Sequence, residues 1–99
     1  MADDLIPTRA VFPVYLRDAI AQTQDLKRQV PGFDVLTIIE RQLDFMRTAT
    51  SGGRVPPEAE RMKTDIGPIA VRNLEESYPD YARLLQELDY AFRRFDQLP

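Results

Sequence analysis

Hydrophobic residues recur at intervals of three and four along most of the chain, which is the spacing of an amphipathic helix. One such stripe covers residues 13–29 and a second covers residues 35–48. The strongest stripe covers residues 79–97, and two shorter helical segments are predicted at 57–63 and 69–76. The pattern therefore predicts an all-α fold, a compact bundle of four to five helices joined by short loops.

Prolines and glycines mark where these helices begin and end. Pro31-Gly32 ends the first helix, and Ser51-Gly52-Gly53 ends the second. Pro79 opens the last helix, because the first turn of a helix does not need the missing N–H. Gly67-Pro68 predicts a break or a kink before the fourth helix. The apolar run Ile69-Ala70-Val71 also allows a short strand, but no second strand is available to pair with it.

Side chains at two helix starts are predicted to cap free backbone N–H groups. Asp34 is the expected cap of the second helix, and Ser77 with Asp80 resembles a capping box before the last. Asp89 and Arg93 are expected to form an exposed ion pair on the outer side of the last helix, worth about 0.2–0.5 kcal/mol. The pooled apolar stripes predict nearly inaccessible side chains at Leu16, Ile20, Leu43, Leu84, Leu88 and Phe92.

The length of 99 residues corresponds to one small helical domain, 1–99, with a modest core. Residues 1–12 are expected to form an extended or mobile N-terminal segment. The acidic start of the chain has no apolar run of the kind found in secretory signals, so we expect a cytoplasmic protein. No apolar run approaches the roughly 20 residues that span a bilayer, so no membrane association is expected.

Charge and missing residue types narrow the function classes. The formal net charge is −3, which argues against general nucleic-acid binding. The chain contains no Cys and no His, which removes thiol nucleophiles, histidine bases and zinc sites built from these residues. Gly52-Gly53-Arg54 lacks the spacing and the Lys-Ser/Thr pair of a phosphate-binding loop and is interpreted as a connector. We therefore expect no enzyme, no cofactor and no metal site.

One stretch is strongly acidic. Between residues 75 and 89 there are five acidic side chains against the single Arg83, a local charge of −4. Such a run is either a solvated helix face or a docking surface for a basic partner, since acidic patches speed association and select partners.

Two stretches resemble a known family. The first is Pro31-Gly32-Phe33-Asp34-Val35-Leu36, continuing through Glu40-Arg41-Gln42-Leu43-Asp44-Phe45-Met46. The second is Ile66-Gly67-Pro68-Ile69-Ala70-Val71-Arg72, followed by Glu75-Glu76 and Pro79. Together they resemble the small helical immunity proteins that neutralise type VI-secreted NAD(P)+ glycohydrolase effectors. These stretches are helix boundaries and core positions, and they contain no chemical motif.

The resemblance implies a stoichiometric inhibitor that binds a cognate toxin and occludes its substrate cleft without catalysis. A cleft that binds a dinucleotide diphosphate offers positive charge or N–H donors, for which an acidic surface can compete. The expected toxin-binding residues are Arg72, Asn73, Glu75, Glu76, Tyr78 and Asp80, with Glu40 and Asp44 of the second helix as second choice. Three alternatives stay open: another nucleotide-targeting toxin, a helical adaptor with a non-toxin partner, and a small enzyme that uses carboxylates alone. The sequence leaves the oligomeric state undetermined.

Overall fold

The computed structural model describes residues 4–99, and the all-α prediction is confirmed for this part of the chain. It contains no strand within these residues, so Ile69-Ala70-Val71 is helical. The helices are α1 (Phe12–Gln29), α2 (Val35–Ala49), α3 (Glu58–Arg61), α4 (Ile66–Asn73) and α5 (Pro79–Arg93). Single 3₁₀ turns, η1 (Ser51–Gly53) and η2 (Phe95–Gln97), follow α2 and α5.

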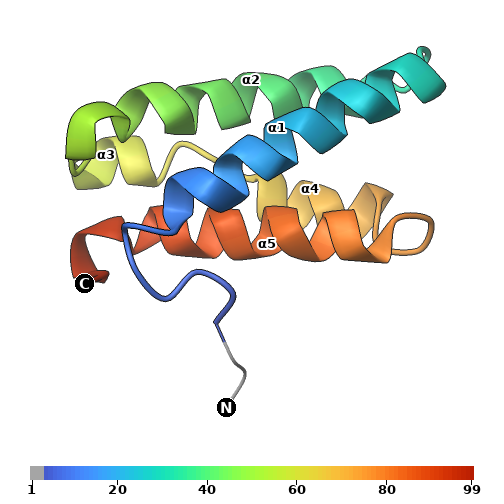
Figure 1. Ribbon diagram of the computed structural model, residues 1–99. Helices are drawn as coiled ribbons and strands as arrows, with labels where there is room; N and C mark the ends of the chain where they lie inside the picture. Colours follow the sequence, from blue (N-terminus) through green and yellow to red (C-terminus); the bar gives the residue numbers. More distant parts are fainter. Residues whose placement is uncertain (1–3) are drawn as a thin grey trace.

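The bundle is organised around α5. This helix packs against α1 and α4, while α1 also packs against α2. Figure 1 shows α2 and α5 on opposite sides of the molecule, with α1 crossing in front of them and α4 beside α5. The turn between α4 and α5 lies at one end of the bundle, whereas η1 and the C-terminus lie at the other.

The helix α4 begins earlier than expected. Gly67-Pro68 was predicted to break or kink the chain, but it occupies the first turn of α4, which starts at Ile66. Proline is compatible with that turn because its missing N–H would have no helical partner there. The helix also ends earlier, at Asn73, so that Glu75 and Glu76 lie in the turn that follows it. The last helix similarly ends at Arg93 rather than at residue 97.

Neither predicted side-chain cap forms. The carboxylate of Asp34 accepts no capping hydrogen bond, because the residue already has helical φ and ψ angles. The Leu36 and Thr37 N–H groups instead donate to the backbone carbonyls of Phe33 and Asp34. The residue before α5 is Tyr78, which also makes no side-chain cap, so the capping-box interpretation of Ser77 is wrong. Backbone turns therefore satisfy the groups that caps would have used.

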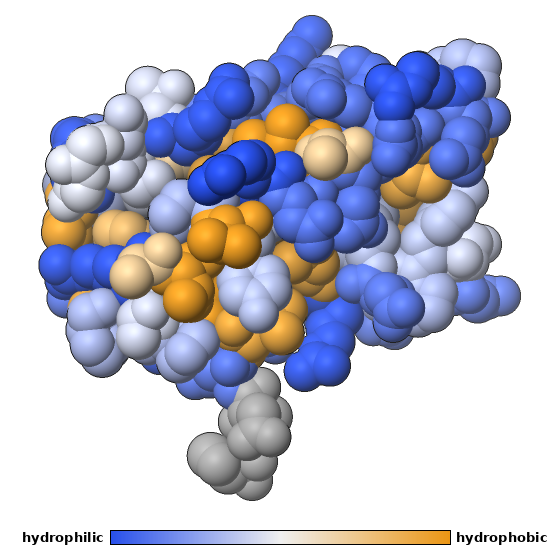
Figure 2. Space-filling view, viewed as in Figure 1, coloured by the Kyte–Doolittle hydropathy of each residue, from blue (hydrophilic) through white to orange (hydrophobic). Residues whose placement is uncertain are grey.

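Residues 4–11 form no helix and lie against the C-terminal part of the chain. Ile6 is buried, and the Leu5 N–H donates to Glu87 Oε1 at 3.2 Å. Arg9 donates through Nε to the Phe95 carbonyl at 3.1 Å, and its backbone N–H donates to the carbonyl of Pro99. The predicted extended or mobile N-terminal segment, residues 1–12, also includes residues 1–3, which lie outside the described residues. Figure 2 shows hydrophobic side chains reaching the surface where this segment meets the start of α1.

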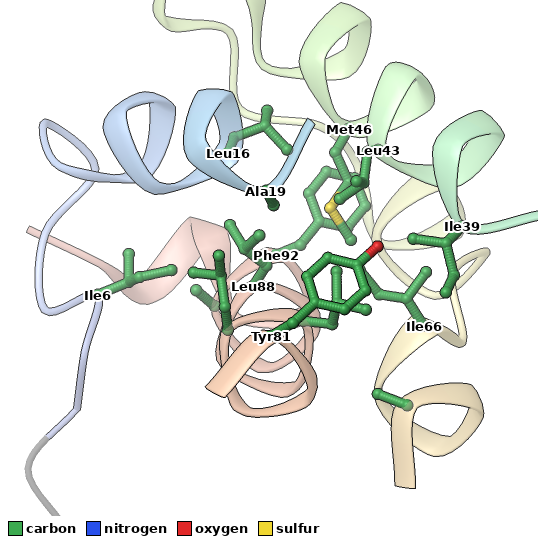
Figure 3. Close-up of a cluster of buried hydrophobic side chains, with 14 of the residues drawn as sticks. Ile6, Leu16, Ala19, Ile39, Leu43, Met46, Ile66, Tyr81, Leu88 and Phe92 are labelled. Atoms are coloured by element: carbon green, nitrogen blue, oxygen red, sulfur yellow. The ribbon is translucent and has the colours of Figure 1, made fainter. Parts of the chain in front are cut away.

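The core lies where α1, α2, α4 and α5 meet (Figure 3). Leu43, Leu88 and Phe92 are completely buried, and Leu16 and Leu84 are nearly so, as the helical periodicity predicts. The sixth predicted core residue, Ile20, is only half-buried, because it lines a surface hollow between α1 and η1. Aromatic rings extend the core toward the C-terminus, with Phe12 stacked on Phe92 and in edge contact with Phe95.

The helix pair α4–α5 is joined by a buried carboxylate. Asp89, expected on the outside, is only 3 % exposed. Its Oδ1 accepts a hydrogen bond from the Thr64 hydroxyl at 2.6 Å, and its Oδ2 accepts one from the Gly67 N–H at 3.0 Å. Arg93 Nε lies 3.7 Å from Asp89 Oδ1, so the predicted pair exists, but its acid faces inward. A Cβ at Gly67 would lie 2.9 Å from Asp89 Oδ2, so only glycine leaves room for the carboxylate.

Candidate functional site

The residues predicted to bind a toxin lie at the end of the bundle formed by the α4–α5 turn (Figure 1). Arg72 and Asn73 belong to the last turn of α4, Glu75 and Glu76 to the turn itself, and Asp80 to the first turn of α5. Tyr78 immediately precedes α5 and is half-buried, whereas the other predicted residues are exposed. The short connection between α4 and α5 thus brings all six residues to one end of the bundle. They are here called the acidic turn: Arg72, Asn73, Glu75, Glu76, Tyr78 and Asp80.

Few of the polar side chains of the acidic turn form hydrogen bonds within the described part of the chain. Among residues 4–99, Glu75 accepts one long hydrogen bond, from Gln86 Nε2 at 3.4 Å. Asn73 donates to the Ile69 carbonyl at 2.9 Å, which stabilises the end of α4. Glu76 and Asp80 accept no hydrogen bond from a side chain and form no ion pair within the same residues. Residues 71–77 also line a hollow of about 430 Å³, so the turn presents a concave, polar surface.

In the structure, fewer of the five acidic side chains between residues 75 and 89 are exposed than the sequence suggests. Glu87 is half-buried and accepts the Leu5 N–H, while Asp89 is buried between α4 and α5. Asp89 is therefore not available to a partner, and Glu87 is only partly accessible. Of the five acids in this stretch, Glu75, Glu76 and Asp80 are the exposed ones.

The second-choice residues on α2 are both paired with cations. Glu40 Oε1 lies 2.7 Å from Lys27 Nζ and joins α2 to α1, with about a quarter of its side chain exposed. Asp44 pairs with Arg47 one turn away at 2.9 Å. Because these carboxylates already have partners, α2 presents less free negative charge than the acidic turn.

A buried hydroxyl pair lies between α1 and α5. The Tyr81 hydroxyl donates to Thr23 Oγ1 at 2.5 Å, and the Thr23 hydroxyl donates to the Ala19 carbonyl at 2.7 Å. Burial raises the pKa of Tyr81 to about 12. The hydrogen bond with Thr23 opposes this rise, because the Thr23 hydroxyl can rotate to donate to the ionised oxygen, and the negative charge of Glu40 adds to the rise. The ordered side chain of Tyr81 therefore packs in the core and is not part of a ligand surface.

Alkaline pH should destabilise the protein through Tyr81. The folded state holds this proton more tightly than the unfolded state, so the stabilisation is complete below about pH 10 and is lost between pH 10 and about pH 12. The free energy of unfolding should fall by up to about 2–3 kcal/mol from this group. Denaturant titrations of Tyr81→Phe should lack this part of the decline, whereas the exposed control Tyr90→Phe should keep it. Equal alkaline declines in both variants would contradict the prediction.

No group of three or more His, Cys, Asp and Glu side chains suited to a metal ion occurs within residues 4–99. Within the same residues, no helix combines the length and the apolar character that crossing a membrane requires.

The sequence analysis missed one surface feature, a hollow of about 350 Å³ at the end of the bundle opposite the acidic turn. It is lined by α1, the end of α2, η1 and Phe95. Its charged residues, Arg9, Arg17 and Arg47, do not form a local sequence motif, so the hollow could not be predicted from the sequence. The partial exposure of Ile20, which the apolar stripe of α1 did not predict, is due to this hollow.

Comparisons with known proteins identify the family. A family model described as Tsi6 matches residues 12–94, which is most of the chain. The Immune protein Tsi6 of Pseudomonas aeruginosa is 30% identical over 77 residues, covering 78% of this chain and 81% of that protein. No solved structure gives a significant match. The resemblance to type VI immunity proteins, drawn from helix boundaries and core positions, is thus confirmed, and the chain belongs to the Tsi6 family of immunity proteins.

Proposed function

We propose that this protein protects its cell by binding a cognate toxin that attacks nucleotides, namely an NAD(P)+ glycohydrolase, and by covering the toxin's substrate cleft with the acidic turn. It acts as a stoichiometric inhibitor in the cytoplasm, where the substrate of such a toxin is found. The observation that carries the proposal is the gathering of three exposed carboxylates, Glu75, Glu76 and Asp80, beside a half-buried aromatic ring, Tyr78.

The chemistry of the toxin's cleft supports this docking mode. A site for a dinucleotide diphosphate provides cations or N–H donors, and carboxylates accept hydrogen bonds from the same groups. Complementary charge steers the two proteins together and selects the partner more than it adds affinity. Tyr78 supplies the aromatic anchor that interface centres favour.

Reversing the two central charges tests the docking surface. Glu75→Lys with Glu76→Lys should leave the fold intact, because exposed positions usually change stability by about 0.5 kcal/mol or less. Association with the toxin should slow by about tenfold or more, since electrostatic steering is lost, and the wild-type rate should fall with added salt. Rates are measured by surface plasmon resonance at two salt concentrations, and protection is measured by survival of cells that express the toxin.

Two matched variants make the result specific. Asp18→Lys with Glu58→Lys changes the net charge by the same amount at exposed positions outside the turn, and it should bind and protect normally. Glu40→Gln with Asp44→Asn tests α2 without placing a new cation beside Lys27. If the α2 variant loses protection while the Glu75/Glu76 variant keeps it, the docking face is on α2 and the assignment is wrong.

The toxin's chemistry is tested separately. Cells intoxicated by the cognate effector should lose NAD(P)+, and the wild-type chain should preserve it at an equimolar ratio. The chain alone should turn over neither NAD nor other nucleotides. Accumulation of a new nucleotide product, with NAD(P)+ intact, would assign a different nucleotide-targeting toxin.

A further inference from the structure

The hollow at the opposite end of the bundle has an apolar floor. Its apolar lining side chains include Phe12, Leu16, Ile20 and Phe95, which come from α1 and from η2 at the C-terminus. Of these four, only Ile20 has substantial exposed surface, because the other three are at most 3 % exposed. Its volume of about 350 Å³ falls within the range of small-molecule sites. Its far wall is the loop 50–53, where added Cβ atoms at Gly52 and Gly53 would contact nothing within 4 Å. The two glycines of this wall therefore have open space beside them.

The charges around this hollow are all positive. Arg9, Arg17 and Arg47 line it, and no Asp or Glu does, although acidic residues outnumber basic ones in the chain by 16 to 13. A hollow lined by apolar side chains and three arginines is complementary to a molecule with a hydrophobic body and an anionic head.

The three arginines differ in how they are held. Arg9 is fixed by hydrogen bonds to the Phe95 and Asp96 carbonyls at 3.1 and 3.0 Å, and its guanidinium lies over the Phe95 ring. Arg47 is paired with Asp44. Arg17 is exposed and makes no hydrogen bond or ion pair with the described part of the chain. Arg17 is thus the cation most available to an incoming anion, while Arg9 and Arg47 form the supporting rim.

We propose that this hollow binds a small amphipathic carboxylate, with the apolar body against Ile20 and the narrow exposed edges of Leu16 and Phe95, and the head group at Arg17. The inference is independent of the toxin-binding proposal, since it concerns a different end of the bundle and a different charge.

Octanoate, kept below its micelle-forming concentration, is the probe. Backbone amide chemical shifts should change for residues around the hollow, including the loop 50–53, and should saturate. Octylammonium has the same chain and the opposite charge, and it should produce no saturable shifts there. Arg17→Glu should weaken octanoate binding at least tenfold, whereas Arg83→Glu, which makes the same charge change on the exposed face of α5, should not.

A second pair of variants tests the location by filling space. Ser51→Trp places a bulky ring in the wall of the hollow and should abolish binding, while Ser77→Trp at the opposite end should leave it unchanged. Equal shifts with octylammonium, equal binding by Arg17→Glu and Arg83→Glu, or equal binding by the two tryptophan variants would each overturn the proposal. If octanoate does not bind but Arg17→Glu weakens capture of the toxin, the hollow receives a protein segment and the small-anion proposal is wrong.

Discussion

Replacing Leu88 with alanine is expected to lower the free energy of unfolding by about 2–5 kcal/mol. Leu88 is completely buried at the centre of α5, the helix that packs against both α1 and α4. Its truncation removes apolar surface from the core and leaves a cavity that three packed helices cannot close without moving together. Thermal and urea unfolding followed by circular dichroism at 222 nm measure the loss.

The exposed residue Val14 provides the control for this truncation. It lies on α1 with 57 % of its surface exposed, so Val14→Ala should change stability by about 0.5 kcal/mol or less. If Leu88→Ala were as stable as Val14→Ala, the packing of α5 described above would be incorrect.

Replacing Asp89 with alanine is expected to cost about 3–5 kcal/mol. The change removes the acceptor for the Thr64 hydroxyl and the Gly67 N–H, and it leaves Arg93 without its carboxylate. Both donors are buried, so each loses a hydrogen bond that water cannot easily replace. Urea unfolding should show the loss, and hydrogen exchange at the start of α4 should accelerate.

Two further variants distinguish this role from simple packing. Asp89→Asn keeps the size of the side chain but offers only one acceptor oxygen, so it should be destabilised less than Asp89→Ala. Gly67→Ala leaves the carboxylate in place but pushes a methyl group against it at 2.9 Å, and it should also destabilise the protein. An Asp89→Ala protein as stable as wild type would show that the carboxylate contributes nothing to joining α4 and α5.

The helices could be predicted because their apolar stripes are local. Residues three and four apart in sequence share one face of a helix, so a stripe such as that of α5 reports both the helix and its buried side. Helix ends were harder to predict. Gly67-Pro68 is compatible either with a break in the helix or with the first turn of a helix. In the structure it forms the first turn of α4, and the Gly67 N–H there donates to Asp89.

Of the two candidate sites, one could be predicted from the sequence and the other could not. The acidic turn was predictable because its residues are neighbours in the sequence, although its true charge was not. The sequence counts Glu87 and Asp89 with the exposed acids, but long-range contacts with Leu5, Thr64 and Gly67 bury Asp89 and partly bury Glu87. The arginine-lined hollow was not predictable, because Arg9, Arg17, Arg47 and Phe95 meet only after the helices pack.

By itself, the sequence of this protein determined the all-α class, the core faces of its long helices, the clustering of Glu75, Glu76 and Asp80 along the chain, and the family resemblance. The structural features among these depend on residues within one or two helical turns, where backbone geometry fixes which side chains are neighbours. The tertiary structure alone decided which charges are buried, where α4 begins, and that a hollow with only arginines on its rim exists. These features depend on contacts between residues far apart in the chain, such as Thr64 with Asp89 and Arg9 with Phe95, which no local pattern encodes.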